Sequence, residues 1–144
     1  MIITRATEYS IRAMLHLAEK YPTPVISKRE ICEAEKITPA FLTKILQPLI
    51  KSGLVLSKRG VSGGFALARE PSRITILDVM RAVDESLVLN VCMAQEDECE
   101  RSSFCPIHVI WNQVKISMEE AFSEKSLAEL VEEKNAKLAF VKSS

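Results

Sequence analysis

Residues 27–67 read SKREICEAEKITPAFLTKILQPLIKSGLVLSKRGVSGGFAL, and this stretch decides the fold. Ser27 and Glu30 form a capping box that starts a short helix at Lys28. A second start signal, at Thr38, opens a helix with a broad apolar face. Two short helices separated by a turn of a few residues outline a helix-turn-helix.

A basic hairpin is predicted directly after these helices. Residues 54–56 and 65–67 are short strand-like runs, and the connection between them, residues 57–64, holds three glycines that allow a tight turn. Lys58 and Arg59 lie in that connection, where they could reach DNA phosphates and the minor groove. The connection is not a nucleotide-binding loop, because it lacks the G-K-[ST] ending and the helix that follows one. The stretch therefore predicts a winged helix-turn-helix.

Helices are also predicted on both sides of this stretch. Residues 4–20 should form the first helix, and Thr75 should cap a fourth that ends near Ser86. A long helix with an apolar stripe is expected over residues 106–122, and Ser126 should cap a last helix. A small winged domain has nothing left to cover that stripe, so we expect the long helix to pair with its twin in a symmetric dimer.

Three cysteines precede the long helix in an acidic loop. Cys92, Cys99 and Cys105 have the spacing C-x6-C-x5-C, and His108 follows three residues later. Pro106 fits the first helical position, which puts Cys105 at the N-cap, where the helix dipole favours a thiolate. Three soft sulfurs with an imidazole suit an iron-sulfur cluster, zinc or copper(I). A structural zinc, a disulfide with one cysteine left over, and unliganded thiols remain the alternatives.

Two other residues of ligand type are expected to be structural. His16 has no metal-type partner near it in the sequence, and Cys32 beside Ile31 should be a small buried hydrophobic side chain.

Composition and charge limit the function classes. The chain has 144 residues and is 47% hydrophobic, which excludes wholesale disorder and supports a real core. It has no apolar run of membrane-spanning length and no signal-peptide pattern, so we expect a cytoplasmic protein. Residues 1–73 hold 12 Lys and Arg against 6 Asp and Glu, whereas residues 74–144 hold 7 against 13. A basic front and an acidic back are typical of a polyanion-binding domain joined to a sensor or pairing segment.

The order of these features resembles the iron-sulfur cluster-binding winged helix-turn-helix regulators that include IscR and NsrR, and the IscR-like members above all. The resemblance rests on residues 9–15, 37–46, 54–67 and 76–86 together with the three cysteines. It implies a mainly α fold with a small β-hairpin wing and a long C-terminal dimerisation helix. It further implies a homodimeric repressor, not an enzyme, that binds a roughly palindromic double-stranded DNA operator and senses iron-sulfur status, redox state or nitric oxide.

The resemblance also assigns site residues. It implies a cluster held by Cys92, Cys99 and Cys105, with His108 as the fourth ligand of a favoured 2Fe-2S cluster, or the partner subunit's Glu8 as the fourth ligand of a 4Fe-4S cluster. The residues expected at the DNA are Lys28, Thr38, Ala40, Thr43, Lys44, Lys58, Arg59, Val61, Ser62, Gly63 and Gly64.

These expectations divide the chain into a DNA-binding region (1–73), a connecting helix (74–90), a cluster-binding loop (91–105) and the dimerisation and C-terminal helices (106–144). Two other classes compete with this interpretation. A redox enzyme or electron carrier could use such a cluster, but the sequence has no nucleotide or flavin motif. A cluster-free winged-helix regulator with structural zinc, responding to a partner protein or a metabolite, would differ in its metal content.

Overall fold

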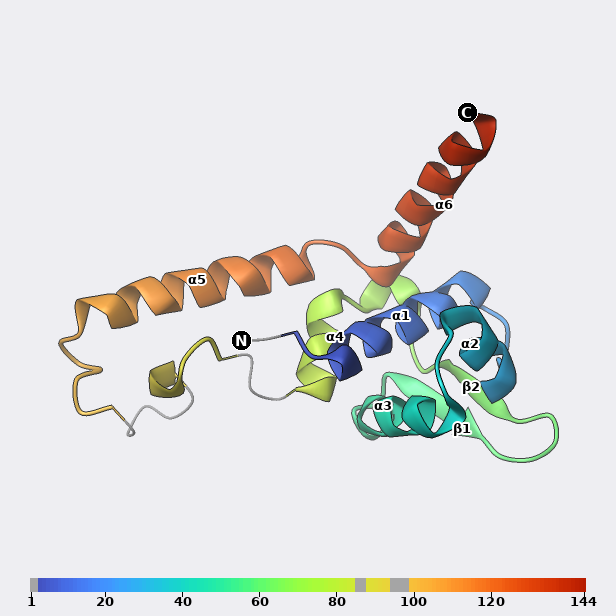
Figure 1. Ribbon diagram of the computed structural model, residues 1–144, viewed down its shortest axis with the longest axis horizontal. Coiled ribbons are helices and arrows are strands. Elements are labelled where there is room, and N and C mark those ends of the chain that lie inside the picture. The colour runs from blue at the N-terminus through green and yellow to red at the C-terminus, as the bar shows by residue number, and fades with distance from the viewer. Residues whose placement is uncertain (1–2, 85–87, 94–98) are drawn as a thin grey trace.

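The computed structural model describes residues 3–84, 88–93 and 99–144. Its elements are α1 (Arg5–Lys20), α2 (Lys28–Glu35), α3 (Pro39–Lys51), β1 (Val55–Lys58), β2 (Gly64–Leu67), the 3-10 turn η1 (Pro71–Arg73), α4 (Ile76–Val83), the 3-10 turn η2 (Val91–Met93), α5 (Pro106–Ser123) and α6 (Leu127–Ser143). Figure 1 shows α1 to α4 and the hairpin gathered in one body, from which α5 and α6 lead away in different directions. The predicted winged helix-turn-helix, mainly α, is confirmed.

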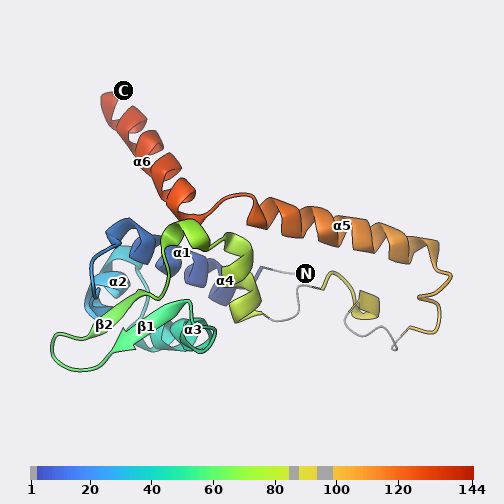
Figure 2. The ribbon, with the colours of Figure 1, turned by 180° about the vertical axis from the view of Figure 1, so that it is seen from behind.

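Helix α1 is the centre of the body. It begins where the Thr4 hydroxyl accepts the backbone N–H of Thr7 at 3.2 Å. Its inner face buries Ala13, Met14 and Leu17, and α2, α3, α4, α6 and β2 all pack against it. Seen from behind in Figure 2, α3 and the hairpin lie on one side of α1 and α6 on the other.

Only half of the capping box predicted for α2 is present. The Ser27 hydroxyl accepts the backbone N–H of Glu30 at 3.1 Å, as predicted. The Glu30 carboxylate does not return to Ser27 among the described contacts; it lies 3.7 Å from His16 Nε2 and 3.5 Å from Lys20 Nζ on α1. The reciprocal half of the prediction is wrong because two side chains brought close by the tertiary fold compete for the same carboxylate.

The wing is a two-stranded antiparallel hairpin. Strand β1 begins one residue after the predicted run 54–56, and β2 begins one residue before the predicted run 65–67. Val55 pairs with Leu67 at its base and Lys58 with Gly64 next to its tip. Ile26, in the segment before α2, exchanges two backbone hydrogen bonds of 2.8 Å with Phe65. The segment before α2 is therefore tied to the wing by an isolated β-bridge.

A side chain at Gly64 has no room. A Cβ built on Gly64 would lie 2.0 Å from the Ile26 carbonyl oxygen, and the residue has φ +156°. Glycine here permits the close backbone approach that ties the wing to the body.

Helix α4 closes the core. Thr75 and Asp78 form a complete capping box, as expected. The helix ends at Val83 rather than near Ser86, and residues 85–87 of the predicted extension lie outside the described residues.

The base of α6 belongs to the core of the body. Ser126 and Glu129 form the second complete capping box. Leu127 is fully buried, and its backbone N–H donates to the Ile74 carbonyl at 2.7 Å. A contact between Lys134 and Glu19 joins the next turns of α6 to α1. None of the helices in the described ranges is long and apolar enough to cross a lipid bilayer.

Candidate DNA-binding surface and cysteine site

A tight turn joins the two helices of the helix-turn-helix. Lys36 ends α2 in the left-handed conformation, φ 54°, and the Ile37 N–H donates to the Cys32 carbonyl at 3.1 Å. The Thr38 hydroxyl then caps α3 by accepting the Phe41 N–H at 3.3 Å. The chain reverses within these residues, so α2 packs directly against α3.

The outward face of α3 carries the residues predicted to contact DNA. Ala40 and Lys44 are exposed, whereas Leu42 on the opposite face is fully buried. Phe41 packs edge-on against Tyr9 with 5.6 Å between ring centroids and lies partly buried against the core.

Two residues predicted as separate DNA contacts touch each other. Lys28 Nζ on α2 donates to Thr43 Oγ1 on α3 at 2.5 Å. The Thr43 hydroxyl in turn donates to the Pro39 carbonyl at 3.0 Å. This chain of hydrogen bonds holds Lys28 and Thr43 at fixed positions beside the exposed face of α3.

The wing presents its predicted basic tip. Lys58, Arg59, Val61 and Ser62 are exposed, and Val61 reaches straight into solvent. Gly63 is half-buried, and a Cβ there would meet the Lys58 carbonyl oxygen at 2.2 Å. Gly64 is buried against Ile26. The hairpin therefore needs glycine at both positions for close backbone packing, whether or not they also contact DNA.

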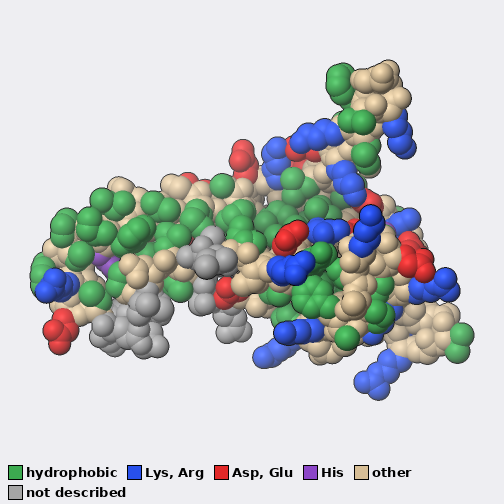
Figure 3. Space-filling view, viewed as in Figure 1, with side chains coloured by type: hydrophobic (Ala, Val, Ile, Leu, Met, Phe, Trp, Pro, Cys, Tyr) green, Lys and Arg blue, Asp and Glu red, His purple; other side chains and the backbone are tan. Residues whose placement is uncertain are grey.

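The predicted DNA-binding surface on α3 and the wing keeps positive charges that are unpaired among the described residues, because the nearby carboxylates pair with other cations. The carboxylates of α1 and α2 that form ion pairs are Glu8, Glu19, Glu30, Glu33 and Glu35. Within the described parts of the chain, Lys44, Lys58 and Arg59 form none. In Figure 3, basic side chains project from the lower edge of the body, where α3 and the wing lie.

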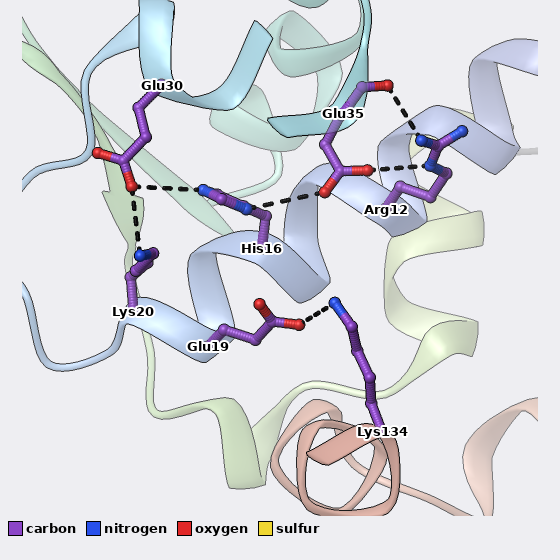
Figure 4. A network of polar contacts seen from close by, with 7 residues as sticks. All are labelled: Arg12, His16, Glu19, Lys20, Glu30, Glu35 and Lys134. Carbon is purple, nitrogen blue, oxygen red and sulfur yellow. Dashed lines mark hydrogen bonds and ion pairs between the residues drawn. The ribbon is translucent and has the colours of Figure 1, made fainter. Parts of the chain in front are cut away.

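A partly buried polar network joins α2 to α1, as Figure 4 shows. Arg12 donates from Nε to the Glu35 carboxylate and from Nη2 to the Glu35 carbonyl, both at 3.0 Å. His16 is 8% exposed, with Nδ1 3.7 Å from Glu35 Oε1 and Nε2 equally far from Glu30 Oε1. The expectation that His16 is structural is consistent with this position. The network was not predicted, although Arg12, His16 and Lys20 recur every four residues in the sequence and so share one face of α1.

The three predicted ligand thiols lie outside the core, next to α5. Cys92, Cys99 and Cys105 are half-buried and free, and Cys92 lies in η2, which packs against α5. Cys105 is the N-cap of α5, as predicted, and its side chain makes no capping hydrogen bond. Figure 1 shows η2 beneath the first half of α5. Cys32, by contrast, is buried in the core as expected, and burial raises the pKa of its thiol.

The two candidate fourth ligands have different surroundings. His108 is half-buried in the first turn of α5, and its Nδ1 is buried without a hydrogen-bond partner among the described residues. The Glu8 side chain is 58% exposed, and its only ion-pair contact with a described residue is to Arg12 Nη1 at 3.9 Å. Among the described residues, no three His, Cys, Asp or Glu side chains lie close enough together to hold a metal ion. The structure thus places Cys92 against α5, the helix whose start holds Cys105 and His108. It does not bring the described ligand residues together into a metal site.

Comparison with known proteins identifies the family. The Rrf2 family, described as iron-dependent transcriptional regulators, matches residues 3–133. The HTH-type transcriptional regulator IscR of Sodalis glossinidius is 34% identical over 91% of this chain and 79% of its own length. Among solved structures, T. potens IscR has a TM-score of 0.75 at 28% identity, covering 93% of this chain and 88% of that one. CymR, the global cysteine regulator of B. subtilis, has a TM-score of 0.74 at 26% identity, with coverages of 92% and 97%. The chain therefore belongs to the Rrf2 family of transcriptional regulators, which are DNA-binding proteins and not enzymes.

Proposed function

We propose that this chain forms a homodimeric transcriptional regulator that senses iron-sulfur status, redox state or nitric oxide through a cluster held by Cys92, Cys99 and Cys105. One observation carries the proposal: three free, half-buried thiols lie outside the core, in the segment that leads into a helix with an unpartnered histidine nitrogen. IscR relatives add the expectation that this chain works in the same way.

The residues present fit an iron-sulfur cluster. Sulfur and imidazole are soft or borderline donors that suit iron in sulfide clusters. The Cys105 sulfur stands at the positive end of an 18-residue helix and makes no capping bond there. The buried Nδ1 of His108 lacks a partner, and a buried nitrogen without a hydrogen bond costs about 1–3 kcal/mol unless something binds it. A cluster would supply a centre that gains or loses electrons and is destroyed by the signals it reports.

His108 is the favoured fourth ligand, with a 2Fe-2S cluster. Its place one helical turn after Cys105 lets both side chains face one ligand. The alternative is the partner subunit's Glu8 with a 4Fe-4S cluster. The exposure of Glu8 and its long contact with Arg12 leave it accessible to a second copy of the chain.

Helix α5 supports the dimer. It has 18 residues and buries none of them within the chain. Its large apolar side chains include Ile107, Val109 and Ile110, which are 48%, 58% and 50% exposed. Figure 3 shows hydrophobic side chains along the whole length of α5. A stripe of this size on a soluble regulator indicates a partner helix, and a two-fold dimer would match a roughly palindromic operator.

A physical route joins the cysteine loop to the DNA surface. Arg81 on α4 contacts Glu119 on α5, with 3.3 Å between Nη2 and Oε1. Helix α4 in turn packs on α1 and α3. A cluster bound in the loop next to α5 would therefore act on α3 in each half of the dimer through α4. A coupling of about 1–3 kcal/mol changes operator affinity five- to a hundredfold.

The test is the metal content and mass of the chain purified without oxygen. We expect about two irons and two sulfides per chain for the His108 arrangement, or about four of each for the Glu8 arrangement. Light scattering should give twice the chain mass of 16.1 kDa. Zinc without sulfide would contradict the cluster and leave a regulator with a structural metal, and a monomeric mass would contradict the dimer.

Arg59 at the tip of the wing is expected to contribute to DNA affinity and not to metal binding. Arg59→Gln should weaken operator binding about tenfold and lower the salt dependence by about one charge, because one phosphate or minor-groove contact is lost. Fluorescence anisotropy at several salt concentrations measures both. Lys142→Gln, which removes an exposed charge near the end of α6, is the matched control and should bind like the wild type. Equal affinities for the two variants would contradict a wing that reaches DNA.

A further inference from the structure

A shallow hollow of about 470 Å³ lies at the base of the wing, away from the cysteine loop. Its lining comes from three places in the chain: the end of α1, the end of β2 and the turn η1. The lining residues are Tyr21, Leu67, Ala68, Arg69, Glu70 and Arg73. Leu67 is 8% exposed and forms an apolar floor, while the two arginines and Glu70 are exposed at the rim.

The two arginines of this hollow lack carboxylate partners. Neither Arg69 nor Arg73 forms an ion pair with any residue in the described ranges. Elsewhere in the same half of the chain, Arg12 and Arg29 are each paired with glutamates. Two arginines and a single glutamate line this hollow, which leaves it with an excess of positive charge.

The hollow lies at the end of the hairpin opposite the tip that is directed at DNA. In the strand register, Lys58 and Gly64 are next to the tip, and Val55 and Leu67 form the last pair at the other end. The strand β2 runs from the tip towards the hollow, which begins at Leu67 and continues to Arg73. An operator contacted by the wing tip would therefore not fill this hollow.

We propose that this hollow binds a small dianion, a phosphate monoester or a dicarboxylate with a short apolar part. Arginine matches the paired oxygens of phosphate and carboxylate with two parallel N–H donors. The Tyr21 side chain, 42% exposed, adds an O–H donor and an aromatic edge, and Leu67 and Ala68 offer an apolar floor. The volume is larger than a bare oxyanion needs, which leaves space for the carbon part of the ligand.

The hollow borders the junction between the wing and the C-terminal helices. Arg73 ends η1, and the next residue, Ile74, accepts the hydrogen bond from the buried Leu127 at the base of α6. Helix α6 itself packs on η1. A ligand that draws Arg69 and Arg73 together would therefore hold β2 and the base of α6 in one arrangement.

The test uses inorganic phosphate, with succinate as a second probe, titrated into the full-length protein at ionic strength held constant with sodium chloride. We expect saturable changes in the side-chain Nε–Hε resonances of Arg69 and Arg73 in nitrogen-15 NMR spectra. Arg73→Gln should weaken phosphate binding about tenfold or more, because a charge-assisted hydrogen bond is lost. Glu70→Gln should tighten it, because the only carboxylate of the lining no longer repels the anion.

Arg59→Gln is the matched control, since it removes an unpaired cation from the wing tip and leaves the hollow intact. Phosphate affinity equal to wild type in this variant, together with the loss in Arg73→Gln, supports the proposal. Changes that rise linearly with phosphate and never saturate would overturn it, as would changes of the same size in a separate titration with sodium chloride alone. So would a loss of phosphate binding in Arg59→Gln but not in Arg73→Gln, which would place the anion on the DNA surface. None of these results depends on whether the cysteines hold a cluster.

Discussion

Replacement of Cys92, Cys99 and Cys105 by alanine together is expected to give a folded dimer without iron or sulfide. The three thiols are the only cysteines outside the hydrophobic core, and all three are half-buried. Their removal takes away every sulfur donor of the proposed cluster, so iron and sulfide should fall to background after anaerobic purification. Operator affinity should change about five- to a hundredfold relative to the cluster-loaded protein.

Cys32→Ala is the matched control for this triple variant. Cys32 lies in the core on α2, and burial raises the pKa of its thiol, which disfavours the thiolate that binds metal. We expect Cys32→Ala to keep its full iron and sulfide and to lose about 1 kcal/mol of unfolding free energy. If the triple variant bound the operator with wild-type affinity and preference, the cluster would not be the switch.

Gly64→Ala is expected to destabilise the winged body by about 3 kcal/mol or more. The added Cβ would lie 2.0 Å from the Ile26 carbonyl oxygen and 2.7 Å from its carbonyl carbon. Both are backbone atoms that cannot rotate away, so the paired hydrogen bonds between Ile26 and Phe65 would have to break or lengthen. Urea unfolding followed by circular dichroism measures the loss.

Gly60→Ala separates the effect of close approach from the effect of backbone conformation. Gly60 also has a positive φ, +109°, but a Cβ there would meet no atom within 4 Å. Its replacement should cost only the local strain, about 1–2 kcal/mol. Equal losses for the two variants would show that the contact with Ile26 contributes nothing to the stability of the wing.

Features set by neighbouring residues could be predicted from the sequence. Cys105 was placed at the N-cap because Pro106 follows it, and the Thr75 and Ser126 caps were placed from residues three positions apart. Features that depend on distant segments could not. Glu30 has the spacing of a capping box but faces His16 and Lys20 across the helix pair. Likewise, nothing local to Ile26 indicates that it pairs with Phe65 of the wing.

The candidate sites divide in the same way. The hairpin pattern was enough to select Lys58 and Arg59 as cations of the wing, whereas Lys44 came from the family resemblance; all three are exposed. That Lys28 and Thr43 form a hydrogen-bonded pair depends on how α2 packs against α3. Whether Arg69 and Arg73 meet a carboxylate depends on where the fold places distant acidic residues. The sequence around these two arginines does not contain that information.

The hydrogen bonds of Thr43 limit what its side chain could offer to DNA in the proposed complex. Its hydroxyl proton is committed to the Pro39 carbonyl, and its oxygen accepts from Lys28. In the proposed complex Thr43 therefore offers the major groove its methyl group rather than a proton donor. A methyl group in that position makes an apolar contact with the C5-methyl of thymine, which no other base carries. The hydrogen bond between Lys28 and Thr43 would then favour thymine at one base pair of each half-site.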